Sequence, residues 1–244
     1  MITLSEITKF LDTELKIAEI EDCSLNGLQV EGKNQIRKAG FAVDASYETL
    51  LSAKEEAVDM LIVHHGIFWE KQEAILGPLY QKLKVLIENE ISLYAAHLPL
   101  DIHPDIGNNA QIAKIVLETS GKQIGDYGYI AEVDIKLSEV VNRIESRLKT
   151  KCRVYYCGKE NLKKVALSSG GGASMLSLAI KEGACLFITG EPRLSSYHLA
   201  KEAGINLIFC GHYATETLGI KALSLETEKR FDVECLFLDL PVNI

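Results

Sequence analysis

The stretch "AKEEAVDMLIVHHG", residues 53–66, determines the fold class that we predict for this chain. An amphipathic segment rich in Ala and Glu leads into the short apolar run of residues 60–63, which ends at two adjacent histidines. The same order recurs in residues 82–101, 179–191 and 198–216. A helix followed by a strand, repeated along a chain, is typical of an α/β sheet covered by helices.

The two halves of the chain resemble each other, so we predict an internal duplication. The segment "FAVDASYETL…MLIVHHG" of residues 41–66 corresponds to "KVALSSGGGASML…CLFITGE" of residues 164–191. No linker rich in Pro, Gly or Ser separates the halves, and a soft boundary falls in residues 120–130. We therefore expect two closely associated α/β lobes with mixed sheets covered by helices, residues 1–126 and 127–244.

The composition favours a globular, cytoplasmic protein. With 244 residues, of which 47% are hydrophobic, the chain can bury a large core. It has no apolar stretch near the roughly 20 residues of a membrane span, and its start lacks the apolar centre of a secretory signal. The formal charge of −8 disfavours nucleic acid as a partner. The six cysteines form no C-x-x-C pair, so we expect mostly buried thiols rather than disulfides or a zinc ribbon.

Two adjacent histidines, His64 and His65, end the apolar run of residues 60–63. Their side chains would point apart within a regular strand, but at a strand end the chain turns and both can face one cavity. A lone histidine is more often a core residue bonded to a backbone carbonyl. Two buried imidazoles side by side need two sets of hydrogen bonds unless something such as a metal organises them. We therefore favour a metal site.

A second pair, His212 and Glu216, stands four residues apart, which places both side chains on one face of a helix. A solvent-exposed His–Glu pair at this spacing is also common. When residues 91–101 are aligned with the segment that contains this pair, with one inserted residue, His97 falls on His212 and Asp101 on Glu216. The sequence thus predicts a histidine followed by a carboxylate at corresponding places in the two halves.

The segment "HLPLDIHPDIGNNA", residues 97–110, also allows plainer interpretations. Pro99 disfavours a helical residue before it, so we expect the first five residues to form a turn. Asp101 can be a turn aspartate. We interpret Asp105 and Asn108 as caps of the helix that "NNAQIAKIVL" begins.

Together, the strand-end residues predict one shared site for two divalent ions. Three histidines and two carboxylates are too few for two separate complete sites, but they suit two ions about 3.5–4 Å apart that are bridged by carboxylates. We assign the bridges to Asp101 and Glu216, and the terminal positions to His64, His65 and His212. The mixed nitrogen and oxygen ligands suit Zn, Fe, Mn or Co and do not choose among them.

Two further segments follow predicted strands and are candidates for the same cavity. The glycines of "SSGGGAS", residues 168–174, would allow close backbone approach and could offer N–H groups to an anion such as phosphate. A plain flexible turn is equally compatible, and neither common phosphate-loop motif is present. Glu191 ends another strand, where we interpret it as a proton-transfer residue rather than a solvated loop carboxylate.

These motifs resemble those of a known family, the GTP cyclohydrolase I type 2 homologues, also called the NIF-three-like proteins. The similarity covers nearly the whole chain, through "NGLQVEG", "VHHGIFW", "LYAAHLPLDIHPDIGNNAQIA", "SSGGGAS", "FITGE" and "GHYATETLGIKAL". The resemblance implies two interlinked α/β lobes, a dinuclear metal centre and a toroidal homohexamer. It places the metal ligands at His64, His65, Asp101, His212 and Glu216, with His97 close to the site.

The resemblance also implies a reaction, in which hydroxide attacks the purine C8 of GTP, the imidazole ring opens and a second hydrolysis releases formate. His97 or Glu191 would then move protons. We therefore favour a metal-dependent hydrolase that acts on a nucleotide or another small heterocycle. The alternatives are a non-catalytic metal-binding protein that interacts with or regulates partners, and a metal-free scaffold whose histidines bond to core carbonyls.

Overall fold

The computed structural model describes residues 2–242, which form two compact units. The first unit contains the chain up to Leu100 and also the later segment Ile220–Leu240. The second unit contains Asp101–Gly219 and, among the described residues, 241–242.

The boundary that we predicted at residue 126 does not coincide with this division. Strand β7 (Lys122–Ile124) pairs with a strand of the second unit, and β13 (Glu234–Phe237) pairs with a strand of the first. Backbone pairing therefore assigns both segments to units other than those expected from their place in the sequence.

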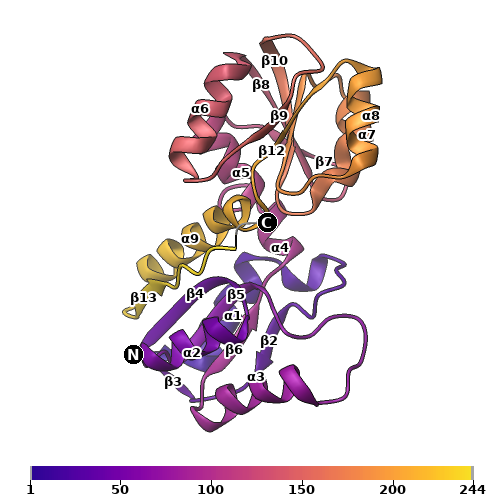
Figure 1. The fold of residues 1–244 in the computed structure, drawn as a ribbon. Coiled ribbons are helices and arrows are strands. Elements are labelled where there is room, and N and C mark those ends of the chain that lie inside the picture. The colour runs from indigo at the N-terminus through magenta and orange to yellow at the C-terminus, as the bar shows by residue number, and fades with distance from the viewer. Residues whose placement is uncertain (1, 243–244) are drawn as a thin grey trace. The chain divides into compact units, whose positions relative to one another are not determined.

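The first unit is built on one central sheet. Its elements are β1 (Ile2–Thr3), α1 (Leu4–Glu14), the 3₁₀ helix η1 (Ile17–Glu19), β2 (Gly27–Val30), β3 (Gln35–Ile36), β4 (Lys38–Asp44), α2 (Tyr47–Glu55), β5 (Met60–His65), α3 (Gly77–Glu88), β6 (Ser92–Ala95) and β13. Five strands form this sheet in the order β13-β4-β5-β6-β2 (Figure 1). The first four are parallel, and β2 is antiparallel to β6.

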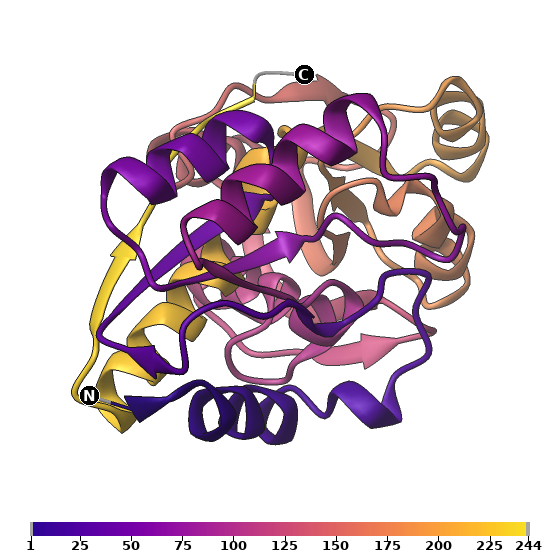
Figure 2. The same ribbon diagram turned by 90° about the horizontal axis from the view of Figure 1, so that it is seen from below.

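Helices cover both faces of this sheet. Leu50 of α2 and Leu86 of α3 pack in one buried cluster with Leu61 of β5. On the other face, the hydroxyl of Tyr94 in β6 donates a 2.9 Å hydrogen bond to Asp12 of α1. Figure 2 shows α1 on one side of these strands and α2 and α3 on the other. A near-continuous apolar run such as that of β5 is expected for a strand that is buried on both faces.

The second unit has a larger mixed sheet. The remaining elements of the chain are α4 (Leu98–Ile102), α5 (Asn108–Ile112), the π-helix η2 (Ala113–Leu117), β7, β8 (Gly128–Lys136), α6 (Leu137–Arg147), β9 (Arg153–Tyr155), β10 (Asn161–Ser168), the 3₁₀ helix η3 (Gly172–Met175), α7 (Leu176–Lys181), β11 (Leu186–Thr189), α8 (Leu194–Ala203), β12 (Asn206–Phe209) and α9 (His212–Arg230). Helix α4 belongs to this unit from Asp101 onward, and helix α9 belongs to it up to Gly219. The strand order is β7-β8-β10-β11-β12-β9, with β10, β11 and β12 parallel and the outer strands antiparallel to their neighbours.

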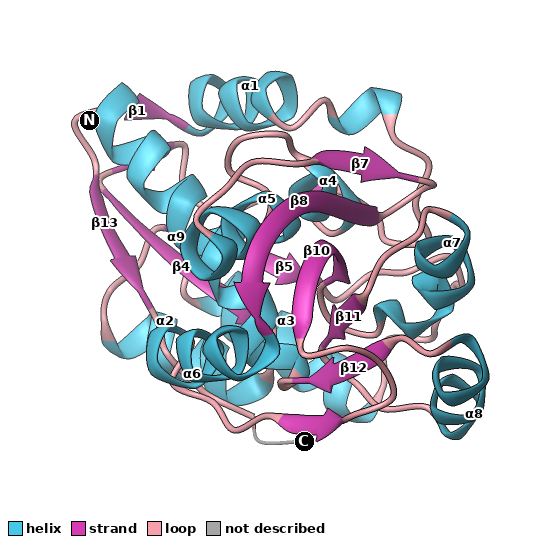
Figure 3. Ribbon diagram, turned by 90° about the horizontal axis from the view of Figure 1, so that it is seen from above, coloured by secondary structure: helices cyan, strands magenta, loops and turns pink. Residues whose placement is uncertain are grey.

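Alternate residues of these parallel strands pack on different helices. Ile188 of β11 belongs to one buried cluster with Ile144 of α6. Its neighbour Phe187 belongs to another cluster with Leu176 of α7 and Ala200 of α8. Figure 3 shows α6 on one side of the strands and α7 and α8 on the other. The period of two along the strand therefore buries both faces of the sheet.

The predicted α/β fold class and the internal repeat are confirmed. In each unit three parallel strands follow one another in both sequence and space, β4-β5-β6 in the first and β10-β11-β12 in the second. These are the segments that the sequence alignment paired. The polar residues of interest follow the carboxyl ends of these strands, where α/β sheets commonly bind ligands.

Two expectations from composition can be compared with the structure. All six cysteines lie in described residues and are free thiols, but only Cys210 is buried, so the expectation of mostly buried thiols was wrong. Among residues 2–242, no helix is both long enough and apolar enough to span a membrane.

Candidate metal centre

His64 and His65 are the last two residues of β5, and their rings lie close together despite the alternation of the strand. The ring centroids are 4.6 Å apart. His64 is fully buried, and its Nδ1 lies 2.9 Å from the backbone oxygen of Ala96. Nδ1 of His65 lies 2.8 Å from Oδ1 of Asp44, at the end of the neighbouring strand β4. A carbonyl or carboxylate only accepts hydrogen bonds, so Nδ1 is the donor and Nε2 keeps the lone pair in the neutral imidazole.

His97 joins these two histidines in the first unit. Its ring centroid lies 5.2 Å from that of His64 and 5.6 Å from that of His65. The three side chains each offer a nitrogen within 4.8 Å of the others, which is close enough to surround a single ion. We refer to His64, His65 and His97 as the three-histidine group.

Asp22, which the sequence analysis missed, anchors His97. Its Oδ1 and Oδ2 lie 2.9 and 3.1 Å from Nδ1 of His97, and only 1% of the Asp22 side chain is exposed. Burial tends to raise the pKa of Asp22, but the hydrogen bond and charge of His97, with bonds from Asn26 and the Leu98 N–H, hold that pKa well below its usual range. The aspartate is therefore an ionised acceptor that fixes the orientation of the imidazole.

The motif "NGLQVEG" holds the surroundings of this group in place. Asn26 accepts the backbone N–H of His97 at 2.8 Å and donates to Asp22 at the same distance. Gln29 accepts the N–H of Ile67 at 2.8 Å, directly after the strand that carries the adjacent histidines. Its side chain occupies the space that a Cβ on Gly66 would need. The segment therefore positions the chain around all three histidines.

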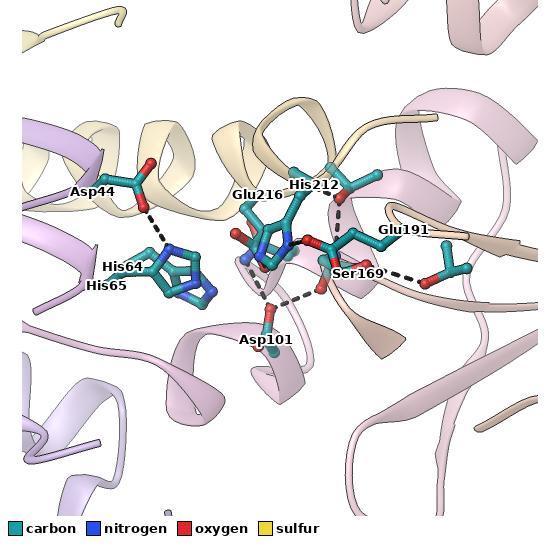
Figure 4. Close-up of polar contacts among 12 residues, drawn as sticks. Asp44, His64, His65, Asp101, Ser169, Glu191, His212 and Glu216 are labelled. Atoms are coloured by element: carbon teal, nitrogen blue, oxygen red, sulfur yellow. Dashed lines mark hydrogen bonds and ion pairs between the residues drawn. The ribbon is translucent and has the colours of Figure 1, made fainter. Parts of the chain in front are cut away.

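In the second unit, Asp101 lies on α4 and is 7% exposed. Its Oδ1 accepts two hydrogen bonds. One comes from Nδ2 of Asn108 at 2.9 Å, and the other comes from Oγ of Ser169 at 2.7 Å (Figure 4). One carboxylate oxygen of Asp101 and one of Glu216 lie within 4.8 Å of each other. Two buried carboxylates at this separation provide the oxygen ligands that a divalent ion requires.

His212 begins α9, and Glu216 lies one turn later, as the spacing predicted. Nε2 of His212 is 3.0 Å from Oε1 of Glu216, which is 3% exposed. Nδ1 of His212 is 2.5 Å from Oε1 of Glu191, which follows strand β11 (Figure 4). Burial lowers the pKa of His212, but the hydrogen bond and charge of Glu216, followed by those of Glu191, outweigh it and raise the pKa to about 9. The metal-free pair therefore stores a proton that a cation would displace.

The glycine-rich turn lies against this pair. A Cβ on Gly170 would lie 2.0 Å from Oε1 of Glu216 and 2.9 Å from Nε2 of His212, and the backbone there has φ +55°. The N–H of Gly170 donates to Thr215, and that of Ser169 donates to Asn109. Those of Gly172 and Ala173 donate to backbone oxygens of the same turn. The turn thus provides close backbone approach, and these four N–H groups are already used within the protein rather than offered to an anion.

Two local predictions were wrong. Residues 98–102 form helix α4 instead of a turn, because Pro99 lies in the first turn of that helix, where its missing N–H is tolerated. Asp105 and Asn108 do not cap α5, whose N-cap residue is Gly107 without a side-chain cap. Asn108 is fully buried and bonds to Asp101 instead.

All four histidines of the candidate site share one arrangement of the imidazole ring, and this arrangement shows whether the residues suit a metal. In each, Nδ1 faces a fixed acceptor, and the four acceptors are the Ala96 carbonyl, Asp44, Asp22 and Glu191. Histidines that bind metals commonly donate one N–H to a carbonyl or carboxylate and bind through the other nitrogen. The side chains of each unit therefore fit a divalent transition metal.

Comparison with known proteins identifies the family to which this chain belongs. The model of the family described as Duf34/NIF3 (NGG1p interacting factor 3) matches residues 2–243. The chain belongs to this family. A relative from Archaeoglobus fulgidus, named GTP cyclohydrolase 1 type 2 homolog, is 41% identical over the full length of both chains. Two solved structures, protein ybgI of unknown function and TTHA1606 from Thermus thermophilus, are 37% and 40% identical, cover each chain fully, and have TM-scores of 0.96 and 0.94.

Membership of the Duf34/NIF3 family confirms the resemblance inferred from the motifs. Within this family member, the groups that can bind a metal consist of His, Asp and Glu side chains that the sequence analysis had selected, together with Asp22 and Cys23 beside His97. The positioning residues Asp22, Asn26, Asn108 and Ser169 were not selected. The first two lie in or beside "NGLQVEG" and the last two in "GNNA" and "SSGGGAS", so the motif boundaries were the signal that could have found them.

Proposed function

We propose that this protein binds two divalent transition-metal ions per chain and uses them to hydrolyse a nucleotide or another small heterocycle. The observation that carries the proposal is that Nδ1 of each of four histidines faces an oxygen acceptor, which is the usual arrangement of histidines that bind a metal through Nε2. Curated relatives that match over the full length are named GTP cyclohydrolase 1 type 2 homolog, which supports a hydrolytic reaction on a heterocycle.

Five residues would hold the ions. Asp101 and Glu216 supply oxygens within 4.8 Å of each other, which supports their proposed role as bridging ligands. His64, His65 and His212 would be terminal ligands through Nε2. This set of nitrogen and oxygen donors suits Zn, Fe, Mn or Co.

When bound, such ions supply Lewis acidity and make water a stronger acid at neutral pH. The protein's own residues orient the ligands. Asn108 and Ser169 fix Oδ1 of Asp101, and Glu191 fixes the imidazole of His212. Preorganised side chains of this kind avoid the cost of reorganisation when a substrate reacts.

We propose His97 for proton transfer. Its Nδ1 is held by the ionised Asp22, so the proton moves at Nε2. Glu191, the other predicted proton-transfer residue, lies 2.5 Å from Nδ1 of His212. That contact supports a positioning role for Glu191.

A second candidate function is supported by the family description, which includes an interacting factor. In this case the ions would be structural, stored or sensed, and the protein would act through binding partners. We also propose that the chain assembles into a homohexamer, as the family resemblance implies. Sedimentation velocity of the untagged protein measures this oligomeric state directly.

The test is a hydrolysis screen with the full chain reconstituted with Mn, Fe, Zn or Co. GTP and other nucleotides are incubated with the protein, and ring-opened products and formate are quantified. We expect turnover that is abolished in His65→Ala and Glu216→Ala and retained in Glu228→Ala, a change of an exposed glutamate on the same helix α9. Stoichiometric metal without turnover of any nucleotide would favour the non-catalytic alternative.

A further inference from the structure

Trp69 is the only tryptophan of the chain, and 39% of its surface is exposed. It lies beside the three-histidine group, with its ring centroid 5.2 Å from that of His97 at an interplanar angle of 74°. The centroid of His65 is 6.2 Å away at 40°. A large apolar ring therefore stands partly exposed next to imidazoles that are suited to a metal.

The backbone around Trp69 is tied to a second segment of the same unit. The N–H of Leu25 donates to the oxygen of Phe68 at 3.0 Å, and the N–H of Glu70 donates to the oxygen of Cys23 at 2.8 Å. Ser24 and Trp69 form an antiparallel bridge between these two bonds. The tryptophan thus sits at an isolated β-bridge that backbone hydrogen bonds hold on both sides, rather than in an unsupported loop.

The imidazole that the indole contacts is fixed as well. His97 is held by the buried Asp22 through Nδ1 and by Asn26 through its backbone N–H. An indole that meets a second ring at a steep angle keeps its own orientation defined. Both the position and the tilt of Trp69 are therefore set before any ligand arrives.

An exposed aromatic ring of fixed orientation is suited to bind another planar ring. Stacking of a base on an aromatic side chain tolerates different ring identities, since every base has a π-face. The location beside His65 and His97 places such a ring within reach of groups that we propose for metal binding and proton transfer.

We propose that Trp69 is the stacking platform for the planar heteroaromatic ring of the small molecule on which the metal centre acts. The proposal rests on the proposed function and adds the part of the substrate that this chain recognises. The indole would bind the ring of the ligand, and other residues would bind any phosphate groups.

The single tryptophan makes the test specific, because all tryptophan fluorescence of the chain comes from Trp69. Metal-loaded full-length protein is titrated with GTP, guanosine, ribose 5-phosphate and inorganic phosphate, with correction for absorbance by the ligands. We expect saturable quenching by GTP and guanosine and none by the two probes without a base.

Calorimetry with GTP then compares variants. Trp69→Leu should bind GTP about 5- to 150-fold more weakly, the range expected for loss of one base stack. Trp69→Phe keeps an aromatic face and should bind within about threefold of wild type, which is less than the loss of a full stack. Tyr156→Leu, which changes another exposed aromatic residue, should bind like wild type. Metal content should be equal in all four proteins.

Equal quenching by ribose 5-phosphate, or wild-type GTP affinity in Trp69→Leu, would overturn the proposal. A changed sedimentation coefficient of Trp69→Leu with unchanged GTP affinity would overturn it too and assign the indole to a contact between copies. Elemental analysis of the same samples separates these results from failure of the proposed function, which would appear as absence of bound metal in the wild type.

Discussion

The side-chain amide of Asn108 lies 2.9 Å from Oδ1 of Asp101, and its own oxygen accepts the N–H of Gly219 at 2.8 Å. Both ends of the amide are therefore engaged, and Asn108 holds the carboxylate in one orientation. We predict that Asn108→Ala weakens metal binding about 10- to 100-fold, the usual effect of losing a residue that orients a ligand. Competition with a metal chelator measures this affinity.

Asp105→Ala is the matched control, since the sequence made Asp105 and Asn108 equivalent capping candidates. Asp105 is exposed, and its side chain does not cap helix α5. Its substitution should leave metal affinity unchanged. Equal losses in both variants would show that the effect of Asn108 is a general one on this segment.

Gly170 and Gly171 are adjacent but differ in the space around them. A Cβ on Gly170 would overlap Oε1 of Glu216, and the positive φ of +55° adds strain, whereas a Cβ on Gly171 would meet nothing nearer than Oε2 of Glu191 at 3.7 Å. We predict that Gly170→Ala abolishes metal binding and destabilises the protein by about 1–3 kcal/mol, the cost of a non-glycine residue in this backbone region. Gly171→Ala should do neither. Elemental analysis and urea unfolding of both variants test this prediction. Equal metal content and equal stability in the two variants would contradict the close approach of Gly170 to Glu216.

The raised pKa of His212 predicts how stability depends on pH in the metal-free protein. A group whose pKa rises from 6.5 in the unfolded chain to about 9 in the folded protein contributes stability that is complete below pH 6.5 and lost as pH rises through 9. The free energy of unfolding of the metal-free protein should therefore fall between these two values. His212→Gln should flatten the decline, and the exposed His198→Gln should not. Urea titrations across this pH range test it, and an unchanged slope in His212→Gln would refute it.

Asp22 should contribute to stability at neutral pH and lose that contribution in acid. Its carboxylate accepts bonds from His97, Asn26 and the Leu98 N–H, and its pKa is lowered in the folded protein. A lowered pKa gives stability that is present above the unfolded pKa of 3.8 and disappears as pH falls through the folded value. We predict that Asp22→Asn costs about 1–3 kcal/mol at pH 7, the usual cost of leaving a buried partner unsatisfied. The cost should shrink below pH 4.

Urea unfolding of Asp22→Asn at pH 7 and pH 3 measures this difference. Asp126→Asn, which changes an exposed aspartate, serves as the control. If Asp22→Asn lowers the free energy of unfolding by the same amount at both pH values, the ionised carboxylate of Asp22 is not the source of the stability.

Much of the fold was predictable because its central parallel strands, such as β5, β11 and β12, are buried on both faces. The apolar run of β5 ends at His64 and His65, so one segment gave both the sheet class and the position of the first candidate ligands. The boundary of the units was not predictable in this way. Strand β13 pairs with β4, almost 200 residues earlier in the chain, and no local pattern reports such a partner.

The candidate ligands were predictable, but the residues that orient them were not. His212 and Glu216 share a helix, so their spacing alone brings them together. Asp22 meets His97 only after the chain has folded, across 75 positions, and an aspartate in a loop has many more common roles. The prediction of a turn at Pro99 was wrong for a different reason. Proline is excluded from helix interiors but is accepted in the first turn of a helix, where Pro99 lies in α4.

The proposed function requires a dinuclear metal centre that depends on Glu216. Elemental analysis of the untagged protein, purified without added ions and again after incubation with Mn, Fe or Zn, tests it most directly, with Glu216→Ala measured in parallel. We predict about two transition-metal ions per wild-type chain, as expected for a two-metal site, and their loss in the variant. Wild-type protein that binds no metal under any of these conditions would contradict it.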